Sequence, residues 1–329
     1  SEPRPVIIYV HGGSWKGGTK TNVDYKADLF TEHNYVFASI NYRLSPNPPD
    51  TTISGVRFPI HPIDVAKAIG FVYENIHQLN GDPQNMHLIG HSAGAHLVNL
   101  VATNQYFLDL NGLSTADIGC VCSLDAGVFD LPFELEIADA SRYLMLLNAF
   151  GLNEAFYHQA SPLFNVEAGE DIPDFLLIHQ GTPLRILKTE GFRDTLHAKG
   201  HPGTSFNAFP YSHGGINTGL GAPEDSIGMT DLVLEFFAGC SGQTTSSFDL
   251  EDVSEVEELV VYPNPSDGRI YFPDPEVREV TVFDVLGKEI GRWSVNDSQL
   301  NLTHLGKGIY FIQASQEAGR KKVGKIFLR

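Results

Sequence analysis

The 329-residue sequence predicts a large α/β domain followed by a small all-β domain. Strand-like and helix-like segments alternate over residues 1–241, which is typical of a mostly parallel sheet with helices on both faces. Residues 242–258 are rich in Ser, Thr, Gln and Gly and then strongly acidic, so we interpret them as a polar linker. Residues 259–329 contain short β-rich runs between turn residues, a pattern that favours a small β-sandwich.

The elements of the two domains follow from the hydrophobic pattern, taken in chain order. In the first domain, buried apolar runs predict strands at Val6–Val10, Tyr35–Ile40, Met86–Ile89, Ile118–Leu124 and Phe175–His179, with a further strand-like run at Phe206–Phe209. Apolar residues at helical spacing predict helices at Val65–Ile76, Ala93–Ala102 and Leu232–Phe237, and mixed helical patterning over Leu131–Asn165. In the second domain, β-rich runs predict strands at Glu279–Val285, Ile309–Ala314 and Lys322–Leu328, with a turn at Leu286–Gly287.

Composition excludes several classes of protein. Hydrophobic residues make up 42% of the chain, so global disorder is excluded, and the formal charge of −18 argues against nucleic-acid binding and against electrostatic membrane attachment. No apolar run approaches the roughly 20 residues of a transmembrane helix. The chain starts just before a strand with no visible signal peptide, so we expect that upstream residues have been removed.

The three cysteines are too few for a disulfide framework. Cys120 and Cys122 lie two apart on an expected strand and therefore face opposite sides of it. We expect structural cysteines in the core.

The strongest chemical motif is Gly90-His91-Ser92-Ala93-Gly94, between an expected strand and an expected helix. This is the setting of a nucleophile elbow, in which small neighbours allow a tight turn that exposes the Ser92 hydroxyl. The simpler alternative is a turn whose serine only caps the helix.

A second motif, His11-Gly12-Gly13-Ser14-Trp15, directly follows the first expected strand. The N–H groups of Gly12 and Gly13 can approach a substrate closely and form an oxyanion hole with the N–H of Ala93. The two motifs in this order favour catalysis over two unrelated glycine turns.

Through these motifs the first domain resembles the esterases and lipases of the α/β-hydrolase fold. The segment Gly90–Leu97 is similar to that of arylformamidases and of feruloyl or acetyl esterases that act on plant polysaccharides. The resemblance implies an ester substrate and a Ser-acid-His triad that needs no metal and no organic cofactor. His213, in a Gly-rich loop before the last helix, stands where the family has its catalytic base, and His179 is the main rival.

The acid departs from the family pattern. The turn Gln180–Arg185, where such esterases usually carry an aspartate, contains no carboxylate. Asp125, directly after the preceding strand, lies in a context similar to that of some lipases, and we favour it. Asp130 as the acid, and a triad without a functional acid, stay open as alternatives.

The second domain also carries a specific resemblance. Val261–Pro265, Val282–Glu289 and Leu305–Phe311 occur in the order found in the type A C-terminal sorting domain of the Bacteroidetes type IX secretion system. This resemblance implies contact with that machinery, export across the outer membrane, and a secreted or surface-attached protein. A carbohydrate-binding sandwich is the alternative.

These observations predict an exported serine hydrolase that cleaves carboxylic esters through an acyl-enzyme. An arylformamidase-like amidohydrolase would use the same triad. The lack of a carboxylate in the turn Gln180–Arg185 also leaves open a second alternative, a non-catalytic binding protein on a hydrolase scaffold.

Overall fold

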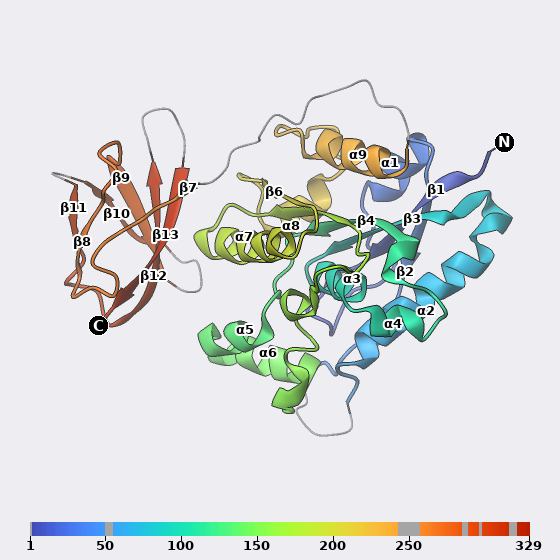
Figure 1. Ribbon diagram of the computed structural model, residues 1–329, viewed down its shortest axis with the longest axis horizontal. Helices are drawn as coiled ribbons and strands as arrows, with labels where there is room; N and C mark the ends of the chain where they lie inside the picture. Colours follow the sequence, from blue (N-terminus) through green and yellow to red (C-terminus); the bar gives the residue numbers. More distant parts are fainter. Residues whose placement is uncertain (1, 50–54, 243–256, 285–288, 296–297, 316–320) are drawn as a thin grey trace. The chain divides into compact units, whose positions relative to one another are not determined.

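The computed structural model describes residues 2–49, 55–242, 257–284, 289–295, 298–315 and 321–329 (Figure 1). The chain forms two compact units, one built on a six-stranded sheet and one built on two smaller sheets. Most of the predicted linker, residues 243–256, lies outside the described residues, and so does the predicted turn at Leu286–Gly287. The proposed domain boundaries therefore stay a prediction.

The large unit contains a fully parallel sheet in the order β2-β1-β3-β4-β5-β6. Its strands are β1 (Arg4–Val10), β2 (Val36–Ile40), β3 (Gly81–His91), β4 (Ile118–Leu124), β5 (Asp174–His179) and β6 (Gly203–Asn207). The predicted α/β class is thus confirmed. The last strand begins and ends earlier than predicted, because pairing with β5 sets Gly203 opposite Phe175 and Asn207 opposite His179.

Helices cover both faces of this sheet (Figure 1). The α-helices are α1 (Lys26–Glu32), α2 (Ile60–Asn75), α3 (Ala93–Thr103), α4 (Gln105–Asp109), α5 (Leu131–Ile137), α6 (Ala140–Phe150), α7 (Pro183–Ala198), α8 (His213–Gly219) and α9 (Met229–Cys240). Short 3₁₀ turns occur at Ile76–Leu79, Thr115–Asp117, Glu154–Phe156 and Pro162–Asn165. None of the helices in the described ranges is long and apolar enough to span a bilayer.

The sheet separates two hydrophobic cores. In β1, Val6, Ile8 and Val10 contribute to the core that includes α2–α6, whereas Ile7 and Tyr9 contribute to the core under α1, α8 and α9. Because side chains alternate along a strand and both faces are covered, the strand is a continuous apolar run.

The sequence did not predict the disulfide that the structure contains. Cys120 in β4 forms a disulfide with Cys240 at the end of α9, across 120 residues, whereas Cys122 is free and buried as expected. The packing of α9 against β4 brings the two residues together, and spacing along the chain could not show this. A disulfide fits an exported protein, since such bonds persist in oxidising compartments.

The small unit is all-β, as predicted. One sheet has the order β10-β9-β12-β13-β7 and is antiparallel except for the β7–β13 pair; the other is the antiparallel pair β11-β8. Its strands are β7 (Glu257–Glu258), β8 (Arg269–Tyr271), β9 (Glu279–Phe283), β10 (Glu289–Ser294), β11 (Gln299–Asn301), β12 (Gly308–Ser315) and β13 (Lys321–Leu328). Ile270 and Leu300 of the short sheet share a core with Val280 and Ile312 of the long one.

Candidate active site

Ser92 lies in a sharp turn between β3 and α3. Its backbone has φ 57° and ψ −114°, an unusual conformation for a residue with a side chain, and its N–H donates to the carbonyl oxygen of Leu124 (2.9 Å). A Cβ placed on Gly94 would lie 2.0 Å from the carbonyl oxygen of Val10, so a glycine is needed there. Local sequence therefore explains the turn, and the turn presents the serine at the carboxyl edge of the sheet.

His213 is the first residue of α8, where the capping Ser212 Oγ accepts from the N–H of Gly215 (3.1 Å). The imidazole is partly exposed, and its Nε2 lies 2.9 Å from Ser92 Oγ. His91 Nε2 donates to the His213 carbonyl oxygen (2.9 Å), so His91 supports the segment that carries His213. Burial, with the nearby His213 as a second cause, lowers the pKa of His91 to about 4, which keeps that ring neutral.

Asp125 follows β4 and is fully buried. Its Oδ2 lies 2.5 Å from His213 Nδ1, and its Oδ1 accepts from the N–H of Gln180 (3.2 Å). The turn that lacks a carboxylate therefore contributes a backbone donor to a carboxylate on the neighbouring strand. This role of Gln180 could not be predicted from the sequence, because a backbone N–H donor leaves no side-chain pattern.

The other residues considered for the triad have different partners. Asp130 Oδ1 accepts from the N–H of Phe133 (3.0 Å) and so caps α5. His179 is buried at the end of β5, and its Nδ1 lies 3.1 Å from the Gln180 carbonyl oxygen. The structure thus brings together Ser92, His213 and Asp125.

The loop after β1 lies against the serine. A Cβ on Gly12 would be 2.9 Å from the His91 carbonyl oxygen and 3.0 Å from Ser92 Cβ, so a glycine fits this close approach without displacing the turn. Gly13 has φ 117°, and its carbonyl oxygen accepts from the N–H groups of Lys16 (3.1 Å) and Gly17 (2.9 Å), which closes a tight turn. Ala93 begins α3, where the first N–H groups have no partner within the helix and carry partial positive charge.

A cavity of about 360 Å³ lies between the loop after β1 and α6. It is lined by Ser14, Lys16, Pro49, Asp139, Ser141, Arg142, Leu144 and Met145. Because Ser14 is two residues from Gly12, this cavity is a candidate for substrate binding. Over the described residues, no group of three or more His, Cys, Asp or Glu side chains could hold a metal ion.

Known families match both units. The BD-FAE family model matches residues 1–184, and the model of the secretion system C-terminal sorting domain matches residues 260–329.

Curated relatives are esterases. Esterase LipQ of Mycobacterium tuberculosis is 29% identical over 255 residues, which cover 73% of this chain and 56% of LipQ. Isoprenylcysteine alpha-carbonyl methylesterase ICME of Arabidopsis thaliana is 33% identical over 111 residues, which cover 34% of this chain and 24% of the relative. The chain therefore spans about half, or less, of the length of these relatives.

Solved structures share the fold of the large unit. Esterase B from Lactobacillus rhamnosis has a TM-score of 0.60 at 22% identity, with 74% of this chain and 78% of that chain covered. A truncated carbohydrate esterase from gut microbiota has a TM-score of 0.60 at 17% identity, with 74% and 88% covered.

Proposed function

The chain belongs to the BD-FAE family of α/β-hydrolase esterase domains through residues 1–184, and on this basis we propose that it is an exported serine hydrolase that cleaves carboxylic esters. Residues 260–329 are a C-terminal sorting domain, which marks the chain for secretion or surface attachment. We further propose that this domain contacts the type IX secretion machinery.

The continuous set of contacts from Ser92 through His213 to Asp125 carries the proposal. Ser92 Oγ attacks the ester carbonyl carbon while His213 Nε2 accepts the hydroxyl proton. Asp125 holds Nδ1–H in the tautomer that leaves Nε2 free to accept, and it stabilises the imidazolium that forms. His213 then donates the proton to the departing alkoxide, which leaves as the alcohol.

The second half of the reaction uses the same groups. A water molecule loses a proton to His213 Nε2 and attacks the acyl-enzyme carbonyl, and collapse of the adduct returns the proton to Ser92 Oγ as the acid leaves. During both halves, negative charge develops on the carbonyl oxygen. The N–H groups of Gly12, Gly13 and Ala93 stabilise this charge, helped by the N-terminus of α3.

The cavity between the loop after β1 and α6 holds part of the ester. Its lining combines apolar side chains, such as Leu144 and Met145, with polar ones, such as Lys16 and Ser141. A substrate with both apolar and hydroxyl-bearing parts fits this lining better than a purely aliphatic chain.

Active-site labelling tests the nucleophile. A fluorophosphonate should label the protein, and Ser92→Ala should abolish both labelling and hydrolysis of p-nitrophenyl acetate, with a loss in kcat of about 10³-fold or more. Ser45→Ala is a matched control, because Ser45 Oγ also lies 3.0 Å from a histidine nitrogen, on His61, but both side chains are buried. A Ser92→Ala protein that is still labelled and active would refute the proposal.

Substrate comparison separates esters from amides. The purified protein should hydrolyse p-nitrophenyl esters faster than N-formylkynurenine. The reverse order would favour the arylformamidase-like alternative over the esterase.

A further inference from the structure

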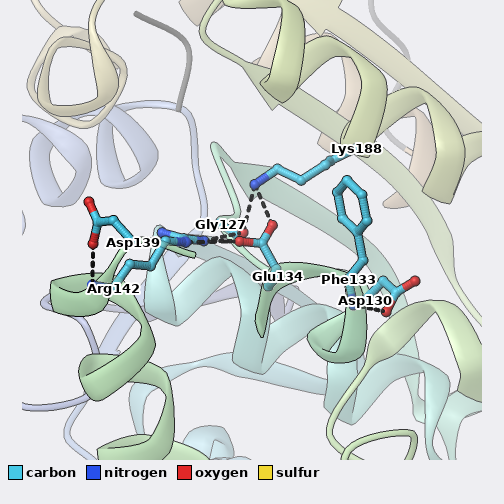
Figure 2. A network of polar contacts seen from close by, with 7 residues as sticks. All are labelled: Gly127, Asp130, Phe133, Glu134, Asp139, Arg142 and Lys188. Carbon is cyan, nitrogen blue, oxygen red and sulfur yellow. Dashed lines mark hydrogen bonds and ion pairs between the residues drawn. The ribbon is translucent and has the colours of Figure 1, made fainter. Parts of the chain in front are cut away.

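Glu134 on α5 is a fully buried carboxylate that lies between two cations. Its Oε1 accepts from Lys188 Nζ of α7, and its Oε2 accepts from Arg142 Nε of α6 (2.9 Å). Figure 2 shows the two long side chains converging on Glu134 from different helices. The side chain of Lys188 is itself almost fully buried, whereas that of Arg142 is about one quarter exposed.

Both cations also donate to one backbone oxygen. Lys188 Nζ and Arg142 Nη2 each lie 3.1 Å from the carbonyl oxygen of Gly127 (Figure 2). Hydrogen bonds from charged donors are stronger than those between neutral groups. Gly127 is two residues from Asp125, so this cluster holds the backbone directly beside the carboxylate that contacts His213.

The cluster is charged. Burial raises the pKa of the Glu134 carboxyl, but the charges of Lys188 and Arg142, with their hydrogen bonds, outweigh it and lower that pKa below its ordinary value. A buried set of ion pairs contributes little net stability compared with apolar side chains of the same shape, because desolvation offsets the attraction. A geometric role therefore explains the cluster better than a gain in stability.

Asp125 is the residue whose backbone conformation must be stabilised. Its φ of 50° is uncommon for a residue other than glycine, and such a conformation persists only when its surroundings impose it. On one side, the N–H of Asp125 donates to the carbonyl oxygen of Ile178 in β5 (2.7 Å). On the other side, the Gly127 carbonyl accepts from the two cations, so the backbone is held on both sides of the carboxylate.

We propose that Glu134, Lys188 and Arg142 are positioning residues that hold the Asp125–Gly127 turn so that Asp125 faces His213 Nδ1. Glu134 orients the two cations, and the cations fix the Gly127 carbonyl. The inference rests on the proposed serine hydrolase function. It also gives a physical reason why the triad acid can be supplied by the segment after β4, although the turn after β5 contains no carboxylate.

Lys188→Met tests the inference, because methionine keeps much of the side-chain volume and removes the donor. A displacement of about 1 Å in a catalytic group can lower the rate on the order of 10²-fold, so we expect a 10- to 100-fold loss in kcat with KM nearly unchanged. We also expect weakening or loss of the strongly deshielded NMR signal of the His213 Nδ1 proton, which Asp125→Asn should abolish. In Lys188→Met, the buried Glu134 charge is balanced by Arg142 alone. The double variant Glu134→Gln/Lys188→Met removes the donor together with that charge, and it should behave in the same way.

Arg193→Met is the matched control. Arg193 lies on the same helix as Lys188 and pairs with Glu190 and Asp194, but it has no contact with Gly127 among the contacts described. It should retain wild-type kcat and the Nδ1 proton signal even where its melting temperature falls.

Wild-type kcat and an intact signal in both Lys188 variants would overturn the inference. If Ser92→Ala is inactive in the same assay, such a result leaves the proposed function standing. If Ser92→Ala is active, the proposed function itself fails. The NMR signal reports the Asp125–His213 contact independently of either activity.

Discussion

Replacing Asp125 with asparagine changes one atom at the centre of the candidate site. Asp125 Oδ1 accepts from the Gln180 N–H, so the asparagine amide oxygen keeps that place. Its NH₂ group then faces His213 Nδ1, at the position where Oδ2 now lies 2.5 Å away. A donor at this position requires Nδ1 to accept, which puts the imidazole proton on Nε2.

The consequence is a histidine in the wrong tautomer. Nε2, which lies 2.9 Å from Ser92 Oγ, would carry a proton and could not accept another. In serine proteases the same exchange lowers kcat on the order of 10⁴-fold, which corresponds to about 5.4 kcal/mol of transition-state stabilisation. We expect a loss of that order, with KM little changed because Asp125 does not line the cavity proposed to bind the substrate.

Steady-state hydrolysis of p-nitrophenyl acetate measures this loss, with the melting temperature as a check on folding. Asp130→Asn is the matched control, because Asp130 caps α5 and an asparagine oxygen can accept the same N–H, so both the melting temperature and kcat should stay close to those of the wild type. The assignment of Asp125 would be refuted if Asp125→Asn lowered kcat by less than tenfold, or if Asp130→Asn lowered kcat more than Asp125→Asn does.

Three further predictions concern stability and organisation. The double substitution Cys120→Ser/Cys240→Ser should lower the free energy of unfolding by about 2–5 kcal/mol in urea titrations, because the disulfide closes a loop across 120 residues; an unchanged midpoint would contradict the disulfide. Burial lowers the pKa of His87 and of His96 to about 4 from 6.5, so the unfolded state binds more protons between these values. The free energy of unfolding should therefore fall as the pH drops from 6.5 to 4, by about 1.4 kcal/mol per pH unit for each histidine. His96→Asn should reduce this slope by about 1.4 kcal/mol per pH unit. An unaltered slope would show that His96 does not titrate on unfolding. A chain of residues 1–241 should fold and keep full esterase activity, because the small unit has its own core. In the native host, export of this fragment should stop, because it lacks the sorting domain. An insoluble or inactive fragment would refute the proposed boundary.

The sequence by itself predicted most strands of the large unit and the tight turn that carries Ser92. Strands buried on both faces must be apolar throughout, so the run Val6–Val10 was recognisable without any partner. The elbow was equally local, because a turn as tight as that at Ser92 requires glycines at fixed positions, and the contact that a Cβ on Gly94 would make shows why. The small unit was recognisable as all-β for a similar reason, although several of its short strands, such as Arg269–Tyr271, were not predicted individually.

Tertiary structure decided everything that depends on which distant segments become neighbours. Asp125 and His213 are 88 residues apart, and only the order β3-β4-β5 brings the end of β4 beside the turn after β5, where Gln180 completes the environment of the carboxylate. Cys120 meets Cys240 only because α9 packs against β4. Glu134 occupies a buried helix position that the sequence could not explain, since its two cationic partners come from other helices. Local patterns report the backbone conformation of a segment, whereas contacts between charged groups depend on packing that no single segment contains.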